Sequence, residues 1–188
     1  MQNIFTKTTF MQGVLNIKKA PPDEGFEFVL AGRSNAGKSS ALNCLTKNKK
    51  LARTSKMPGR TTEVNFFKVN DEIKLVDLPG YGFSKMSIDK KKNLDILLDN
   101  YFSSRQSLCA AIIFMDIRHP LKDSDIQMME FCNRHGVPFI SVLTKSDKLN
   151  SSAIAKSSKS VEKKLNSQSV IVTSSNNDEG FDRLSKKI

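Results

Sequence analysis

The sequence predicts an α/β fold of three layers, in which a mostly parallel sheet of six strands, with one antiparallel hairpin, lies between helices. Strand and helix patterns alternate along the chain, which favours parallel strands joined by helices. Residues 108–115 form a near-continuous apolar run, typical of a parallel strand that is buried on both faces. Asn70-Asp71 separates two further strand patterns and is a signal for a tight hairpin turn.

Apolar periodicity and turn residues set the expected elements. One face of the predicted helix at 89–103 is apolar, and Gly136 ends the predicted helix at 124–134. In chain order we predict a strand at 26–31, a helix at 38–46, strands at 64–69 and 73–77, a helix at 89–103, a strand at 108–115, a helix at 124–134, a strand at 138–143, a helix at 152–165, a strand at 170–173 and a short helix at 180–188.

The length of 188 residues indicates one domain, which we expect at residues 25–188, with residues 1–24 as an N-terminal extension packing on it. Three scattered cysteines (Cys44, Cys109 and Cys132) lack metal-ligand spacing and are interpreted as small buried hydrophobes in a reducing compartment. No apolar run approaches the roughly 18 residues of a membrane span, and residues 1–22 lack the apolar segment of a signal peptide. We therefore expect a cytoplasmic protein.

A phosphate-binding loop is predicted where the first strand meets the first helix. Residues 32–39 read GRSNAGKS and fit the pattern G-x-x-x-x-G-K-[ST]. Gly32 and Gly37 permit turns and close backbone approach, so that successive N–H groups can surround a phosphate. Lys38 would reach the β- and γ-phosphates, and the Ser39 hydroxyl would coordinate Mg²⁺.

Two further segments match the chemistry of phosphoryl transfer. Asp77-Leu78-Pro79-Gly80 follows a strand, so Asp77 can hold Mg²⁺ through a water and the Gly80 N–H can sense the γ-phosphate. Thr61 and Thr62 precede the second strand, and one of these hydroxyls can complete the Mg²⁺ shell. We choose Thr61, although ordinary β-propensity at a strand start also explains the pair.

The segment Thr144-Lys145-Ser146-Asp147 predicts guanine as the base. The Asp147 carboxylate can accept hydrogen bonds from guanine N1–H and the 2-amino group, whereas adenine presents an acceptor and would leave it unpaired. The stem of Lys145 can cover the base plane. Thr173-Ser174-Ser175 can offer backbone N–H groups to guanine O6, although a polar turn at a strand end explains it too. These features argue against a kinase that uses ATP.

The net charge of +11 predicts a polyanionic partner. Residues 32–62 contain eight Lys or Arg and no acid, and a second cluster lies at 85–92. A third cluster lies near the C-terminus: Lys156, Lys159, Lys163, Lys164, Arg183, Lys186 and Lys187. One nucleotide needs far fewer cations, although a merely soluble basic protein would show a similar total.

With these motifs in order, the chain resembles the translation-factor-related GTPases, and within their TrmE-Era-EngA-EngB-septin group it resembles the EngB (YihA/YsxC) family of ribosome-biogenesis GTP-binding proteins. The segments that carry the resemblance are GRSNAGKSSALN (32–43), PGRTTEVNFF (58–67), DLPGYGF (77–83), DIRHPLKDSD (116–125) and LTKSDKL (143–149). The resemblance implies a Ras-like P-loop GTPase domain that binds GTP or GDP with Mg²⁺, hydrolyses GTP slowly and helps to assemble the large ribosomal subunit, with a link to division septation in some bacteria. It implies the large subunit or its precursor and rRNA as partners. We expect a monomer and no DNA among its partners.

The resemblance also assigns the site residues. Lys38, Thr61 and Gly80 are the predicted catalytic residues, and Thr144, Lys145, Asp147, Thr173, Ser174 and Ser175 the predicted guanine contacts. The predicted phosphate contacts are Gly32, Arg33, Ser34, Asn35, Ala36, Gly37, Lys38, Ser39, Ser40, Gly59, Arg60, Thr61, Asp77, Leu78, Pro79 and Gly80. Ser39, Thr61 and Asp77 (through a water) are the predicted Mg²⁺ residues. Asn35 either holds K⁺ beside the phosphates, as in related GTPases, or only shapes the loop.

Tyr81 follows Gly80, where many GTPases have a glutamine that orients the attacking water. A phenol ring has no equivalent amide, so we predict slow hydrolysis that rises when a partner orders the switch loops. The alternative is a nucleotide-stabilised RNA-binding or division-linked interaction protein with negligible catalysis. Arg118 and His119 either satisfy their own loop or mark a partner surface.

Overall fold

The computed structural model describes residues 3–52, 63–82, 87–166 and 170–188. A sheet of seven strands forms its centre, in the order β1-β3-β4-β2-β5-β6-β7. The strands are β1 (Thr9–Val14), β2 (Phe26–Gly32), β3 (Val64–Lys68), β4 (Ile73–Asp77), β5 (Leu108–Asp116), β6 (Phe139–Thr144) and β7 (Ile171–Val172). The α-helices are α1 (Lys38–Leu45), α2 (Ile88–Ser104), α3 (Asp123–Arg134), α4 (Ser151–Leu165) and α5 (Phe181–Ser185). Short 3₁₀ turns lie at η1 (Ile4–Lys7), η2 (Ile17–Lys19) and η3 (Ser146–Lys148).

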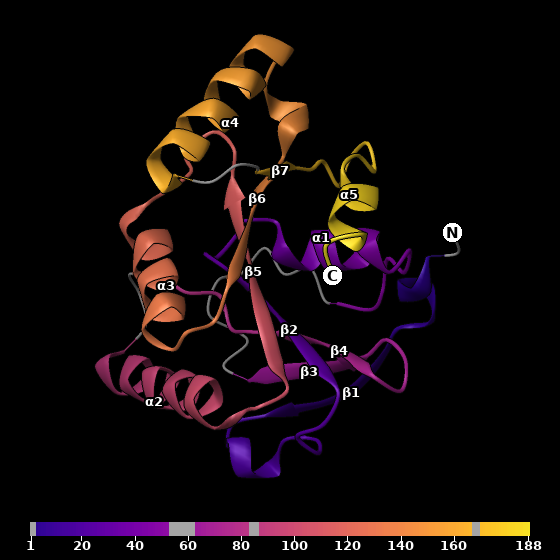
Figure 1. Ribbon diagram of the computed structural model, residues 1–188, viewed down its shortest axis with the longest axis vertical. Coiled ribbons are helices and arrows are strands. Elements are labelled where there is room, and N and C mark those ends of the chain that lie inside the picture. The colour runs from indigo at the N-terminus through magenta and orange to yellow at the C-terminus, as the bar shows by residue number, and fades with distance from the viewer. Residues whose placement is uncertain (1–2, 53–62, 83–86, 167–169) are drawn as a thin grey trace.

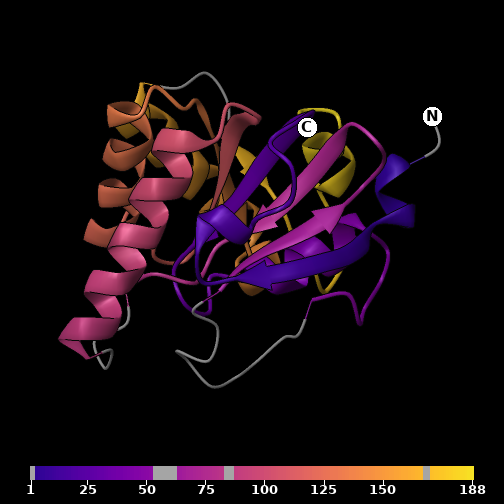
Figure 2. The same cartoon turned by 90° about the horizontal axis from the view of Figure 1, so that it is seen from below.

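Helices cover both faces of the sheet and create two apolar clusters (Figures 1 and 2). One cluster joins the sheet to α2, α3 and α4 through side chains such as Leu97, Met129 and Val161. The other joins it to α1 and α5 through Leu42 and Leu184. The layered α/β fold expected from the sequence is confirmed. No helix among the described residues is long and apolar enough to cross a membrane.

The topology gathers the functional loops at one edge of the sheet. The pairs β2–β4, β2–β5, β5–β6 and β6–β7 are parallel. The carboxyl ends of these strands therefore face the same way, and ligands of such sheets bind beyond those ends. The hairpin is also present: β3 runs antiparallel to β4, and the Asn70 side chain accepts hydrogen bonds from the N–H groups of Glu72 and Ile73.

The sheet has seven strands, not the six expected. The additional strand, β1, belongs to the N-terminal extension and runs antiparallel to β3, from Thr9 opposite Lys68 to Val14 opposite Val64. β1 lies at the edge of the sheet, where even an aromatic side chain such as Phe10 stays 54% exposed. Apolar residues in this strand therefore do not mark a buried face. The pairing joins residues 50 (Val14 and Val64) to 59 (Thr9 and Lys68) positions apart, so no local sequence signal reports it. The extension also places Phe5, 1% exposed, in the second apolar cluster.

The C-terminal elements are shorter than expected: β7 has two residues and α5 ends at Ser185 rather than at residue 188. The cysteines also differ, because Cys132 is buried as expected whereas Cys44 and Cys109 are only half-buried.

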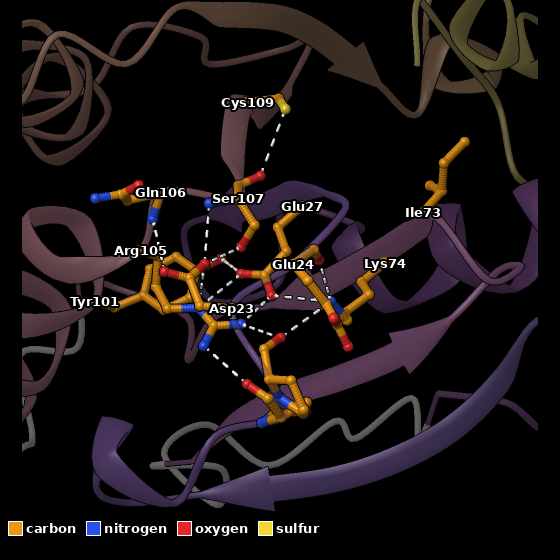
Figure 3. Close-up of polar contacts among 12 residues, drawn as sticks. Asp23, Glu24, Glu27, Ile73, Lys74, Tyr101, Arg105, Gln106, Ser107 and Cys109 are labelled. Carbon is orange, nitrogen blue, oxygen red and sulfur yellow. Dashed lines mark hydrogen bonds and ion pairs between the residues drawn. The ribbon is translucent and has the colours of Figure 1, made fainter.

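A buried polar cluster lies at the opposite edge of the sheet from the phosphate loop, and its members come from distant segments (Figure 3). Glu27 of β2 is completely buried and accepts hydrogen bonds from the Tyr101 hydroxyl (2.8 Å) and from Arg105 Nε (3.2 Å). Arg105 also donates to the carbonyl of Pro21 (2.8 Å). The cluster thereby fixes the C-terminal end of α2 to the segment that enters β2.

Candidate guanine-nucleotide site

The phosphate loop lies between the end of β2 at Gly32 and the start of α1 at Lys38, as the motif predicts. A Cβ on Gly32 would lie 2.9 Å from the carbonyl oxygen of Phe114, so the close packing of β2 on β5 requires glycine there. Gly37 has a φ of 91°, which side chains disfavour. Asn35 has a φ of 62°, which asparagine tolerates better than most residues. The loop therefore has the backbone of an anion-binding turn at a helix N-terminus.

Lys38 and Asp77 meet beneath this loop. The Lys38 ammonium forms an ion pair with the Asp77 carboxylate, and both side chains are almost completely buried. Lys38 begins α1 and Asp77 ends β4, so the parallel pairing of β2 and β4 brings the two together. Lys38, a cation suited to phosphate, and Asp77, a carboxylate suited to a hydrated metal ion, thus lie side by side at the carboxyl ends of the parallel strands.

Thr144 and Lys145 connect the base-binding segment to the phosphate loop. The Thr144 hydroxyl donates to the carbonyl oxygen of Ala36 (2.5 Å), and its side chain packs against Gly37. Lys145 Nζ donates to the carbonyl oxygen of Asn35 (2.6 Å) and forms an ion pair with Asp116 (3.0 Å). The stem of Lys145 therefore spans from the predicted base-binding segment to the phosphate loop.

Asp147 is oriented by the segment that follows β7. Its Oδ1 accepts a hydrogen bond from the Ser174 hydroxyl (2.8 Å), and Ser174 is completely buried. The hydrogen bond from Ser174 is the largest influence that lowers the pKa of Asp147, so this carboxylate is ionised at neutral pH. A fixed, ionised carboxylate can accept the N1–H and 2-amino protons of guanine.

The turn at residues 173–175 contributes differently from the expectation. The Thr173 N–H donates to Leu143 (2.7 Å) and the Ser174 N–H to Glu179 (3.0 Å), so neither is free for guanine O6. Ser174 instead acts through its hydroxyl. The Ser175 N–H donates to no acceptor among the described residues, which leaves it as the donor of this turn for O6.

Gly59, Arg60 and Thr61 lie outside the described residues, so their predicted contacts stay predictions. The remaining predicted phosphate and base residues converge on one edge of the sheet. Five of them line a cleft together with Asp116 and Arg118: Arg33, Ser34, Asn35, Ala36 and Lys145.

The Asp116 carboxylate is paired with Arg118 of its own loop and with Lys145. Burial opposes its ionisation, but hydrogen bonds from Arg118 and Lys145 hold the pKa of the carboxyl well below its usual range. Arg118 makes two such bonds, from Nε (2.9 Å) and from Nη2 (2.6 Å). Of the two interpretations of Arg118, the pairing within the loop is therefore the one that the structure supports.

Asp125 ends the segment DIRHPLKDSD, but the sequence patterns assigned no role to it. Asp125 is 1% exposed and accepts a hydrogen bond from the Tyr81 hydroxyl (3.1 Å). Tyr81 consequently points toward α3. The chain carries no local signal for this contact, because the two residues are separated by 44 positions.

The matches with known proteins agree with this geometry. A family model described as "50S ribosome-binding GTPase" matches residues 27–145. A probable GTP-binding protein EngB from Mannheimia succiniciproducens is 46% identical over 188 residues, which cover 98% of this chain and 92% of that protein. The chain belongs to the EngB family of GTP-binding proteins. A second EngB relative, from Stenotrophomonas maltophilia, is 50% identical over 152 residues, covering 81% of this chain and 76% of that protein.

Solved structures share the fold of this EngB protein. A crystal structure of a probable GTP-binding protein EngB has a TM-score of 0.69 at 21% identity and covers 86% of this chain and 95% of that chain. A variant of Aquifex aeolicus Era bound to GDP and AlF₄⁻ has a TM-score of 0.67 at 19% identity, covering 87% of this chain and 56% of that chain. Membership of the EngB family, together with this fold, makes the chain a P-loop GTPase that binds GTP and hydrolyses it.

The donor set of this EngB site fits Mg²⁺. No group of three or more His, Cys, Asp or Glu gathers as a metal site in the part of the chain that the structure describes. Mg²⁺ in nucleotide sites needs only one or two protein oxygens, because phosphates and waters complete its shell. The Asp77 carboxylate and the Ser39 hydroxyl at the start of α1 supply such oxygens.

Proposed function

We propose that this EngB protein is a cytoplasmic, monomeric GTP-dependent switch in the assembly of the large ribosomal subunit, where it binds rRNA. The description of the matching family as 50S ribosome-binding supports this role. The observation that carries it is the guanine-nucleotide site on a chain of net charge +11. The link to normal division septation that the resemblance implies stays a prediction.

A lysine-rich face of α4 supports an RNA partner. Its exposed lysines are Lys156, Lys159, Lys163 and Lys164. None of them forms an ion pair with a described residue. The single acid of this helix, Glu162, accepts the Val170 N–H instead. Lys156 and Lys163 lie about 10 Å apart along the helix, so the face can contact several phosphates of an RNA backbone without reading its sequence.

Within the GTPase cycle, we propose that Mg²⁺ is held by Ser39, Thr61 and, through a water, Asp77. It would supply positive charge at the phosphates, beside Lys38. Tyr81 offers no amide to a water and its hydroxyl is engaged by Asp125, so we propose slow unassisted hydrolysis. K⁺ bound at Asn35 stays a proposal that equal turnover in K⁺ and Na⁺ would exclude.

Co-sedimentation with large-subunit precursor particles tests the role in assembly. We expect stronger binding with a non-hydrolysable GTP analogue than with GDP, and a steep loss of binding as salt rises. The triple variant Lys156→Gln, Lys159→Gln and Lys163→Gln should bind weakly. The matched control neutralises three exposed lysines of the N-terminal extension, Lys7, Lys18 and Lys19, and should bind almost normally.

Two results would contradict the proposal. Equal binding to the particles in both nucleotide states would contradict a nucleotide-dependent switch. If the two triple variants lost particle binding equally, only the net charge of the protein, and not the α4 face, would explain the binding. One observation favours the second candidate function, an interaction protein with negligible catalysis: the Tyr81 hydroxyl is already bound to Asp125. Single-turnover hydrolysis in the presence of the particles distinguishes the two, because only the switch should accelerate.

A further inference from the structure

Asp125 is a buried carboxylate that none of the nucleotide motifs contains. It lies in the first turn of α3 and its two oxygens serve different partners. Oδ2 accepts the N–H of Lys122 (3.1 Å), which caps the helix, and Oδ1 accepts the Tyr81 hydroxyl (3.1 Å). Burial raises the pKa of the Tyr81 hydroxyl far above its usual range, so this group stays a proton donor.

The Tyr81 backbone binds the phosphate loop at the same time. Its N–H donates to the carbonyl oxygen of Gly32 (3.3 Å), and its carbonyl oxygen accepts the N–H of Ser34 (3.1 Å). A single residue thus contacts the phosphate loop through its main chain and α3 through its side chain.

Gly80 lies immediately before this anchor, and its N–H has no acceptor in the part of the chain that the structure describes. The N–H of Leu78 donates to Leu30 and the N–H of Tyr81 to Gly32, whereas Pro79 has none. The Gly80 N–H donates to no acceptor among the described residues. Gly80 packs so closely on the loop that a Cβ there would lie 3.3 Å from Ser34 N. A free N–H is therefore fixed beside the loop that holds the phosphates.

We propose that Asp125 is a positioning residue for GTP: by holding the Tyr81 hydroxyl, it keeps the Gly80 N–H where the γ-phosphate arrives. The inference rests on the assignment of Gly80 as the γ-phosphate sensor. GDP lacks that phosphate, so the contact acts on GTP alone. Asp125 thereby couples the start of α3 and the segment that precedes it to the nucleotide state.

Arg33 supports the same arrangement. Its Nε is buried and has no hydrogen-bond partner among the described residues. It lies close to Gly82, where a Cβ would approach Nε to 3.3 Å. Arg33 and Asp125 line one cleft. Burial raises the pKa of Asp125, and the guanidinium charge of Arg33 acts against that rise. An ionised carboxylate accepts the Tyr81 hydroxyl more strongly than a neutral one.

Nucleotide affinities of the Tyr81→Phe variant test the proposal. The substitution removes the hydroxyl and leaves the ring and the cap on α3. We expect the Kd of a non-hydrolysable GTP analogue to rise about tenfold, while the Kd of GDP stays within about twofold. Asp125→Asn, which preserves side-chain size, is measured in the same way and should shift the same ratio.

Tyr101→Phe is the matched control. Its hydroxyl also donates to a buried carboxylate, Glu27 (2.8 Å), but at the opposite edge of the sheet. The two Tyr→Phe variants should lose similar thermal stability, whereas Tyr101→Phe should leave the GTP-to-GDP affinity ratio unchanged. An unchanged ratio in both Tyr81→Phe and Asp125→Asn, or an equal shift in Tyr101→Phe, would overturn the proposal.

Discussion

We expect single residues to decide which nucleotide this site accepts. Asp147 is ionised, and its two oxygens are held by Ser174 (Oδ1, 2.8 Å) and Lys148 (Oδ2, 3.1 Å) before a base arrives. Lys145 reaches across to the phosphate loop at Asn35. A carboxylate in a fixed position rejects a base that does not donate two protons to it, because a desolvated charge would remain unpaired.

Asp147→Asn should weaken GDP binding by about 100-fold or more, because an amide cannot accept both guanine protons. Xanthosine diphosphate carries a carbonyl in place of the 2-amino group, so its affinity should rise. Competition against a fluorescent guanine nucleotide measures both changes. Asp178→Asn is the control, since that exposed acid pairs with Lys47. Unchanged discrimination between the two bases would refute the assignment.

Two elements outside the nucleotide motifs hold the scaffold in place. β1 extends the sheet beyond β3, and η1 carries Phe5 into the cluster beneath α1. The polar cluster around Glu27 fixes the end of α2 to the entry of β2. Both features connect the N-terminal extension to the rest of the fold.

Phe5→Ala should lower the free energy of unfolding by about 3 kcal/mol, because it empties a well-packed position. The matched control is Phe10→Ala, whose ring is 54% exposed, and it should cost less than about 1 kcal/mol. Urea unfolding followed by far-UV circular dichroism measures both. Equal effects would show that the extension is not anchored through Phe5.

Glu27→Gln should destabilise the protein by about 3 kcal/mol, because it removes the buried carboxylate that pairs with Arg105 and leaves Arg105 only its longer ion pair with Asp23 (3.5 Å). Glu24→Gln, at an exposed position nearby, should have little effect. The affinity for GDP should stay within about twofold, since the cluster lies far from the phosphate loop. A loss of affinity without a loss of stability would contradict a purely structural role for this cluster.

The whole molecule should lose stability as the pH falls below about 5. The folded state holds the pKa values of Asp23, Asp116 and Asp147 below the ordinary value of 3.8. The stabilisation that these carboxylates contribute is present above pH 3.8. It is lost as the pH falls further, because the unfolded chain binds protons at these groups before the folded state does. Asp125 acts in the opposite direction, because burial raises its pKa and its contribution falls as the pH rises.

Urea unfolding between pH 7 and pH 3 measures this dependence. Asp116→Asn should be destabilised relative to the wild type at pH 7 and less so at pH 3. At pH 3 the unfolded chain already binds a proton at Asp116, whereas the folded state, in which the pKa of this carboxyl is lowered, still holds the charge. A difference that is independent of pH would contradict an ionic contribution from Asp116.

Local sequence patterns predicted the layered fold, the phosphate loop and the residues around Lys38, Asp77 and Asp147. Such motifs are readable because each requires particular residue types at fixed spacing along a continuous segment. The hairpin at Asn70 was predictable for the same reason. The boundaries of α5 and β7 were less so, because packing rather than propensity ends short elements.

By itself, the sequence determined that this chain is an α/β protein with a guanine-nucleotide site, because those signals are local. Only the tertiary structure showed that β1 pairs with β3, that Ser174 acts through its hydroxyl, and that Tyr81 is bound to Asp125. These are contacts between segments far apart along the chain. The strength of each contact depends on how deeply the two groups are buried and on the distance between their atoms. Both quantities are set only when the whole chain has folded.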